Sequence, residues 1–210
     1  MPNYVKHVVS ITSENDATIK KVKNILTDPE GNFTFQGIIP RPKSLEIEAS
    51  TYTEEGVAYH RADKEKQAEM LEKWKKHWND DVVERIIRLG EIGIENIEKY
   101  GYATWYDWSI DNWGTKWDAC DTNVFTYDNY IGIEFQTAWS TPYPVFEKLA
   151  KEFPDIEIEV KYADEDLGTN CGIYAFKNGV ESYRTEMGAD FAQDLWGYDD
   201  DCLFPDEEEY

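Results

Sequence analysis

The chain has 210 residues, enough for one large domain or for a smaller domain that carries an insertion. Hydrophobic residues make up 41% and aromatic residues 15% of it, so the composition excludes a largely disordered chain and permits a sizeable core. The formal net charge is −22, and this excess of carboxylates disfavours direct binding to nucleic acid or to an anionic membrane.

The three cysteines, Cys120, Cys171 and Cys202, are far apart and form no Cys-x-x-Cys pair. This usage is typical of a reducing compartment and predicts neither a disulfide framework nor a zinc site. The first residues lack a basic segment followed by a long apolar run, and no apolar run reaches membrane-spanning length. We therefore predict a cytoplasmic protein with no membrane partner.

The N-terminal segment reads as a strand, a helix and a second strand. Residues 4–12 are rich in Val and Ile and predict the first strand. A helix of about three turns follows, with N-cap candidates near Asn15 and an end at Asp28-Pro29. Residues 33–39 predict the second strand, which the prolines that follow cannot continue. Together they predict a βαβ opening.

A long excursion separates this opening from the next predicted strands. Residues 43–60 are polar and read as irregular, with a short edge strand at 45–49. From 62 to 99 apolar residues recur at helical spacing, interrupted at Asn79-Asp80, where Asp80 can cap a second helix. Lys and Glu alternate on the other faces, so this segment is nearly neutral while the rest of the chain is acidic.

Residues 102–117, YATWYDWSIDNWGTKW, hold four of the eight tryptophans. Thr104 and Asp107 resemble a capping box, and Gly114 is suited to end the helix that starts there. Residues 117–125 and 130–138 then predict two strands joined by a tight turn.

The C-terminal third continues the alternation of helix and strand. A helix is predicted from Thr141-Pro142 to a stop at Pro154, followed by strands at 156–161 and 173–177. Asn178-Gly179 predicts a hairpin turn after them. The segment from Thr185 onward contains no Lys or Arg, and its end, DDDCLFPDEEEY, is expected to be mobile.

This order predicts an α+β fold, a ferredoxin-like sandwich in which two helices pack on an antiparallel sheet. We expect one such domain over residues 1–184, with an α-helical insertion at about 61–113 between strands 2 and 3. Residues 185–210 form an acidic C-terminal tail in this division.

Four short segments resemble the YubB ferredoxin-like family of phage and plasmid proteins: GIIPRPKSL (37–45), WYDWSIDNWGTKWDA (105–119), FQTAWSTP (135–142) and YADEDLG (162–168). The core Trp-Gly-Thr-Lys-Trp is the most specific of them. The resemblance spans roughly residues 5–179, and it implies the ferredoxin-like fold and an origin in a mobile element. It implies no catalytic residue, because the family has no assigned activity, and it does not extend to the acidic tail.

The Trp-rich segment holds most of the candidate binding residues. Trp108 and Trp117, together with Asp107, Asp111 and Lys116, could form an aromatic platform for a sugar, a cation or a nucleobase. Packing is the favoured alternative, because large aromatic residues at helical spacing usually bury against a sheet. Asp107 and Asp111 are four residues apart on one helix face, a spacing that is also common on solvated faces.

Asp164 and Asp166 belong to an acidic turn, DEDLGTN, which superficially resembles a calcium loop. It lacks the Gly required at position six, where Thr169 stands, and the Glu required at position twelve, where Ala175 stands. We interpret it as a turn that can join an acidic binding surface. We find no catalytic, metal-ligating or cofactor-binding motif, so an enzyme is the less favoured interpretation.

Three functions remain open, of which the weakest is a structural or assembly protein that acts as an oligomer. The first is a non-enzymatic phage- or plasmid-type accessory protein that binds a basic host protein through its acidic surface. Such a protein could act as an inhibitor or DNA mimic directed at a nucleic-acid-binding or defence factor in the host cytoplasm. The alternative is a nucleotide- or sugar-binding protein, or a hydrolase, with a pocket beside residues 102–117.

Overall fold

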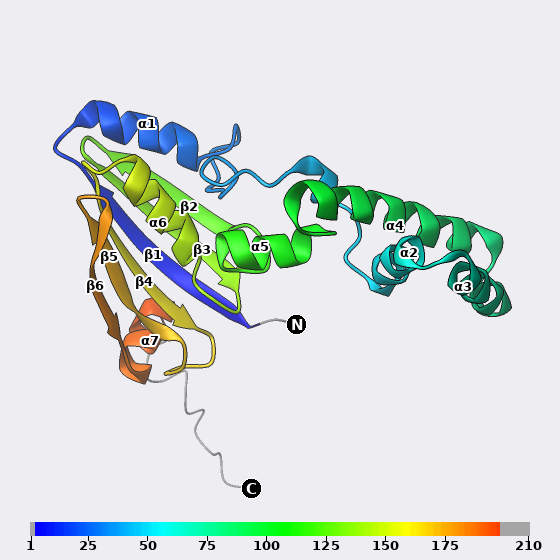
Figure 1. Cartoon of the computed structure of the whole chain (residues 1–210). Helices are drawn as coiled ribbons and strands as arrows, with labels where there is room; N and C mark the ends of the chain where they lie inside the picture. Colours follow the sequence, from blue (N-terminus) through cyan, green and yellow to red (C-terminus); the bar gives the residue numbers. More distant parts are fainter. Residues whose placement is uncertain (1–2, 198–210) are drawn as a thin grey trace, which may run out of the picture. The chain divides into compact units, whose positions relative to one another are not determined.

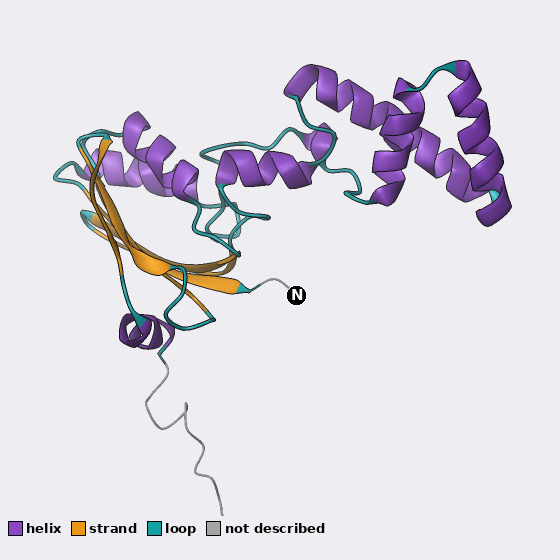
Figure 2. Ribbon diagram, turned by 60° about the horizontal axis from the view of Figure 1, so that its bottom comes forward, coloured by secondary structure: helices purple, strands orange, loops and turns teal. Residues whose placement is uncertain are grey.

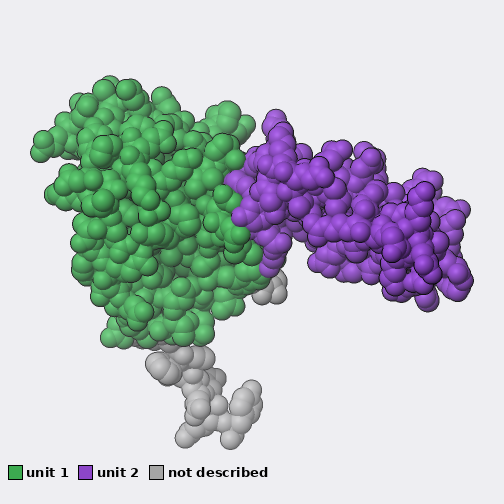
Figure 3. Space-filling model, viewed as in Figure 1, with its two compact units in different colours: residues 1–40, 110–210 green, residues 41–109 purple. Residues whose placement is uncertain are grey.

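A computed structural model describes residues 3–197 and divides the chain into two compact units (Figure 3). One unit combines residues 1–40 with residues 110–210, and the other is the continuous segment 41–109. We call them the sheet unit and the helical unit, after the structure that each contains. Each has its own buried hydrophobic residues, as expected of a compact unit.

The sheet unit contains a six-stranded antiparallel sheet in the order β2-β3-β1-β4-β5-β6 (Figure 1). Its strands are β1 (Tyr4–Thr12), β2 (Cys120–Tyr127), β3 (Tyr130–Ala138), β4 (Glu157–Asp164), β5 (Cys171–Lys177) and β6 (Val180–Glu186). Helix α1 (Asp16–Leu26) follows β1, and helix α6 (Tyr143–Glu152) follows β3. Two strand–helix units whose strands interleave in the order 2-3-1-4 define the ferredoxin-like arrangement. The predicted α+β, ferredoxin-like fold is therefore confirmed.

Helices α1 and α6 lie on one face of the sheet, and helix α7 (Ala189–Trp196) lies on the opposite face (Figures 1 and 2). The core fills the space under α1 and α6. Strand β1 contributes every second side chain to it, because successive side chains of a strand point to opposite faces. Val9 of β1 lies between Ile133 of β3 and Val160 of β4 in the register, and all three are fully buried.

The predicted second strand at 33–39 was wrong. Phe33 makes an isolated bridge with Thr27, and the segment then turns without joining the sheet. Phe33 and Phe35 are nevertheless buried, which explains the strand-like alternation in the sequence. Gly37 lies so close to α1 that a Cβ atom there would be 1.8 Å from the carbonyl oxygen of Ile25. The second strand of the ferredoxin-like arrangement is β2, so the long excursion precedes that strand.

The C-terminal part of the sheet unit extends the ferredoxin-like arrangement. Strands β5 and β6 form the hairpin that Asn178-Gly179 predicts, and both turn residues have positive φ. The segment from residue 185, expected to be a tail, contains the end of β6 and all of α7. Residues 198–210, with Cys202 and the acidic end whose mobility the sequence predicts, lie outside the described residues.

The helical unit contains the 3-10 helix η1 (Lys43–Leu45) and helices α2 (Thr51–Arg61), α3 (Lys64–His77) and α4 (Asp80–Tyr100). Its core is built from Trp74 of α3 with Val83 and Ile86 of α4. The predicted break at residues 79–80 is confirmed, but Asn79, and not Asp80, is the N-cap residue. Helix α5 (Trp105–Trp113) begins in this unit and ends in the sheet unit.

Helix α2 replaces the irregular segment and edge strand predicted at 43–60. Its buried residues are Thr53, Gly56 and Val57, which have helical spacing but little hydrophobicity. At the crossing of α2 and α4, a Cβ atom on Gly90 would be 2.1 Å from the carbonyl carbon of Gly56. The two backbones can approach this closely because neither residue has a side chain.

Candidate functional site

The Trp-rich segment serves mainly as packing. Helix α5 starts after Thr104, whose Oγ1 accepts a hydrogen bond from the backbone N–H of Tyr106 at 3.4 Å, and Gly114 follows the helix with a φ of +78°. Trp108 is 7% exposed and Trp113 is fully buried. The Trp113 indole donates a hydrogen bond to the carbonyl oxygen of Ile39 at 2.9 Å. These positions confirm the packing interpretation for the two tryptophans.

Lys116 lies between two aromatic rings of the sheet unit. Its Nζ is 5.1 Å from the ring centroid of Trp117 and 4.7 Å from that of Trp139. A cation between two indole faces gains electrostatic attraction from both rings. Trp139 is 42% exposed and has a φ of +68°, an uncommon conformation for a residue with a side chain. The space between the two rings therefore already holds a cation of the protein itself, and a binding role for Lys116 and Trp117 stays a prediction.

The four aspartates among the predicted site residues lie in different environments. Asp107 lines a hollow in the helical unit, whereas Asp111 is exposed on the part of α5 that belongs to the sheet unit. Asp164 is buried, and its carboxylate accepts hydrogen bonds from the Asn3 side chain at 3.1 Å and the Asp166 N–H at 2.9 Å. Asp166 is exposed. Their binding roles stay predictions, and Asp164 organises a turn.

The hollow that Asp107 lines has a volume of about 560 Å³. It lies between one face of α2, with Glu54, Val57 and Arg61, and the segment from Ala103 to Asp107. This volume is within the range of small-molecule sites, about 300–1,000 Å³. The α2 side of the hollow was not predicted, because Thr53 and Gly56 at buried positions give the sequence no apolar stripe there. The Ser50 N-cap, which accepts a hydrogen bond from the Tyr52 N–H at 3.2 Å, was the one available signal.

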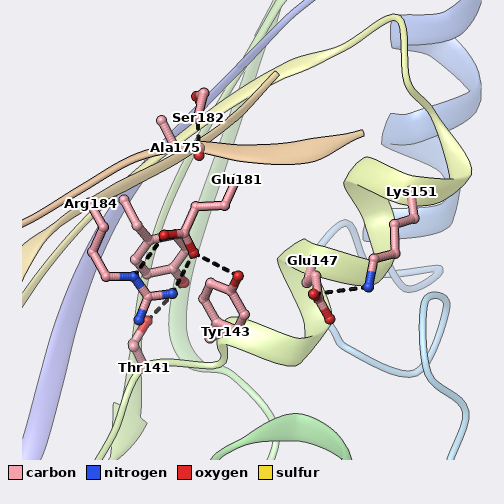
Figure 4. Close-up of polar contacts among 9 residues, drawn as sticks. Thr141, Tyr143, Glu147, Lys151, Ala175, Glu181, Ser182 and Arg184 are labelled. Carbon is pink, nitrogen blue, oxygen red and sulfur yellow. Dashed lines mark hydrogen bonds and ion pairs between the residues drawn. The ribbon is translucent and has the colours of Figure 1, made fainter. Parts of the chain in front are cut away.

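A polar network ties the start of α6 to the edge strand β6 (Figure 4). The Tyr143 hydroxyl donates a hydrogen bond to Glu181 Oε2 at 2.7 Å, and Arg184 donates to both oxygens of that carboxylate, at 2.6 and 3.1 Å. The Arg184 guanidinium also lies 4.4 Å from the Tyr143 ring centroid. Burial, and then the Glu181 carboxylate, raise the pKa of Tyr143 to about 12. The network holds a neutral tyrosine in place at the edge of the sheet.

His7 is the most unusual titratable group of the core. It is fully buried, stacks on Phe135 with the ring centroids 4.5 Å apart, and neither ring nitrogen has a hydrogen-bond partner of ordinary geometry. Burial lowers its pKa from 6.5 to about 3, and weak contacts with the backbone of Val5 and Phe135 offset only part of this effect. His7 is therefore a neutral packing residue.

The two cysteines within residues 3–197 are weak nucleophiles. Cys120 and Cys171 are free thiols, and burial raises the pKa of each, which lowers their reactivity. Within this described range, no group of three or more His, Cys, Asp or Glu side chains is placed to hold a metal ion. None of the described helices combines the length and apolar character needed to cross a membrane.

The comparison with known protein families agrees with the fold. Residues 112–203 match the family model described as the ferredoxin-like domain in Api92-like protein. A solved structure, protein api92 from Yersinia pseudotuberculosis, aligns with 90% of this chain and 99% of its own at 11% identity and a TM-score of 0.45. No curated protein sequence matches the chain. The sheet unit is ferredoxin-like, and its residues 112–203 are similar to the domain of the Api92-like proteins.

Proposed function

We propose that this chain is a non-enzymatic accessory protein whose sheet unit binds a protein partner with a basic surface. The division of charge between the two units carries the proposal. The sheet unit has 28 Asp and Glu residues against 10 Lys and Arg, while the helical unit has 15 against 11. Of the 28 acidic residues, 21 lie within the described part of the chain. Most of the excess negative charge, 18 of 22, therefore belongs to the sheet unit.

The helical unit pairs many of its charges internally. Lys66 lies 2.9 Å from Glu69, Lys76 lies 2.8 Å from Glu72, and Arg85 pairs with Glu48. In the sheet unit, even complete pairing of the cations would leave most carboxylates without one. Such an excess attracts cationic surfaces and repels phosphate backbones, so it favours a basic protein over nucleic acid.

Four exposed carboxylates at one end of the sheet form what we call the α7 acidic surface: Glu165, Asp166, Asp190 and Asp194. The turn that carries the first two lies against α7, because a Cβ on Gly168 would be 3.1 Å from that of Ala189. Asp190 and Asp194 are four residues apart on one helix, a like-charge spacing that costs stability. Asp194 also lies near the negative end of the helix dipole. A basic partner would relieve both effects.

We also propose a phage or plasmid origin for the protein. The four segments that resemble the YubB family support membership of that family and an origin in a phage or plasmid. On this reading the protein acts in the cytoplasm of the host cell. Its target is a nucleic-acid-binding or defence factor, whose basic groove the α7 acidic surface occupies in place of DNA.

Affinity capture from host lysate at low and high salt tests this proposal, since screening weakens such attraction. We expect a partner that is retained at low salt and lost when the four residues of the α7 acidic surface are changed to Asn or Gln. The matched control changes four exposed glutamates of the helical unit, Glu65, Glu91, Glu95 and Glu98, to Gln. Equal loss with both variants, or no partner at low salt, would overturn the proposal.

The hollow beside Asp107 favours a second candidate function, the binding of a nucleotide or another small molecule in the helical unit. Arg61 could neutralise an anionic group, and Val57 and Tyr106 provide apolar surface. Tryptophan fluorescence during titration with nucleotides tests it. We expect a saturable change that is weakened at least tenfold in Arg61→Ala. A response that is unchanged in Arg61→Ala, or no response at all, contradicts this candidate.

A further inference from the structure

A second hollow lies on the face of the sheet that α7 partly covers, and its volume is about 340 Å³. It belongs entirely to the sheet unit. Six side chains give it its chemistry: Lys6, Asp121, Asn123, Glu134, Gln136 and Trp196. They come from β1, β2, β3 and α7, so the fold brings together residues that are up to 190 positions apart.

The strand register places the polar side chains on one face. Lys6 faces Gln136 and Asn123 faces Glu134, and all of them point away from the core that His7 and Phe135 occupy on the other face. Between Cys120 and Asn123 the pairing of β2 shifts by a bulge. Bulges often redirect side chains beside functional sites.

Asp121 lies in this bulge with a φ of +50°, in the left-handed region that Asp adopts more readily than most residues with a side chain. Its carboxylate accepts a hydrogen bond from the Gln136 side-chain amide at 2.9 Å. The bond fixes the amide so that its carbonyl oxygen and second N–H stay available, as does the other carboxylate oxygen. The bulge thus presents donors and acceptors in a fixed arrangement.

Trp196 supplies a flat apolar wall to the hollow. Its indole N–H donates to the carbonyl oxygens of Ala163 at 3.2 Å and Asp164 at 3.1 Å, so its hydrogen-bonding edge is turned into the protein. The ring packs beside the small cluster of Ala163 and Cys171, and Lys6 Nζ is 5.9 Å from its centroid. Because the ring is held from behind, ligand binding would cost little side-chain entropy.

The hollow holds charges of both signs, so a strongly charged ligand would meet a like charge in it. Lys6 disfavours a cation in front of Trp196, and the carboxylates of Asp121 and Glu134 disfavour an anion. The ligands that fit best are therefore neutral molecules with one flat apolar side and many hydroxyl groups, which both donate and accept hydrogen bonds. We propose that this hollow binds a neutral saccharide ring, with its C–H face on Trp196 and its hydroxyls on Glu134, Gln136 and Asn123.

Saturation-transfer NMR on the full chain tests the proposal with glucose, galactose and N-acetylglucosamine. Glucosamine and glucuronate serve as charged counterparts of the same ring. We expect at least one neutral sugar to bind and to bind at least threefold more tightly than its charged counterparts. A panel without any binding sugar, or tighter binding of a charged counterpart, would overturn the assignment.

Variants locate the binding. Trp196→Ala should weaken it at least tenfold by removing the wall, and Glu134→Ala with Gln136→Ala should do so without disturbing the anchorage of α7. Trp139→Phe and Asp107→Ala are the controls, because Trp139 lies beside Lys116 and Asp107 lines the other hollow. Binding that survives both the Trp196 and the Glu134/Gln136 changes would place the sugar elsewhere and refute the proposal. Loss with Asp107→Ala alone would move it to the helical unit.

Discussion

Each of the two units of this protein is built from contacts of a different kind. In the sheet unit, β1 at residues 4–12 pairs with β3 at 130–138 and with β4 at 157–164, so its core forms only when distant segments meet. The helical unit, by contrast, is the single continuous segment 41–109. Contacts that are local in sequence form at a lower cost in loop-closure entropy. The helical unit can therefore assemble from one stretch of chain, whereas the sheet unit needs both of its parts.

The units also differ in what fills their cores. The sheet unit relies on aromatic volume, with Phe135 in contact with the rings of Phe33, Phe35 and Phe146 at centroid distances of 4.8 to 6.2 Å. The helical unit relies on the absence of side chains where α2 crosses α4. Opposite substitutions should therefore damage them: loss of volume in the sheet unit and added volume in the helical unit.

Phe135→Ala should give the largest effect. It removes a fully buried ring at the centre of the sheet unit, and such substitutions cost about 3–5 kcal/mol of unfolding free energy. Hydrogen exchange measured by mass spectrometry should show lost protection in β1 and β3, with α2 and α4 unchanged. The control is Tyr127→Ala, because Tyr127 is 69% exposed. An equal loss of protection in α2 and α4 would break the distinction between the units.

Gly90→Ala is the complementary change in the helical unit. Alanine gains about 1 kcal/mol of helix propensity over glycine, but its Cβ would overlap the backbone of Gly56, and overpacking costs up to about 3 kcal/mol or more. We expect a net loss of about 2 kcal/mol, seen as faster hydrogen exchange in α2 and α4 only. Glu91→Ala, at an exposed position of the same helix, should not destabilise it. A more stable variant would show that the crossing can widen at no cost.

His7 makes the stability of the sheet unit depend on pH. Its pKa is about 3 in the folded protein and 6.5 in the unfolded chain, so below pH 6.5 the unfolded state binds the extra proton. The contribution of His7 to the unfolding free energy is almost complete above pH 6.5. It is lost as the pH drops toward 3, and the loss between pH 7 and pH 5 is about 2 kcal/mol.

Urea unfolding of His7→Phe at a series of pH values measures this contribution. The variant should lose the part of the pH dependence that lies between pH 6.5 and 5, while its stability relative to the wild type rises as the pH falls. His77→Asn, at an exposed position of α3, should keep the wild-type dependence. Parallel curves for the wild type and His7→Phe would mean that the pKa of His7 is the same in the folded and unfolded states, as for an exposed imidazole.

The fold class could be predicted because its signals are local. The alternation of Val5, Val9 and Ile11 with polar neighbours, and the Asn178-Gly179 turn, depend only on residues close in sequence. The strand expected at 33–39 failed for a tertiary reason: Phe33 and Phe35 alternate as in a strand, but the backbone around Gly37 packs against α1 and does not pair. Helix α2 escaped notice because Thr53 and Gly56 take positions that usually hold Leu or Ile.

The candidate sites were harder to predict, because the fold brings together residues that are far apart in the sequence. Asp107 was a predicted site residue, yet its partners Glu54 and Arg61 lie on the helix that the sequence did not indicate. Trp196 was assigned to a tail, because no residue near it in the sequence indicates that α7 packs on a face of the sheet. The register that places Lys6 beside Gln136 is a property of the assembled sheet.

Glu181→Gln should have the smallest effect on stability. It tests whether ion pairs stabilise the edge of the sheet unit. Glu181 is partly exposed, and such pairs contribute less than about 1 kcal/mol. The Gln side-chain oxygen can still accept the Tyr143 hydrogen bond, and Arg184 keeps its position over the Tyr143 ring. We expect the melting temperature to fall by less than about 4 °C. Glu147→Gln, which breaks a single exposed pair with Lys151, should lower it still less. If Glu181→Gln instead detached β6, seen as lost hydrogen-exchange protection there, the edge of the sheet unit would depend on charge and not on its aromatic core.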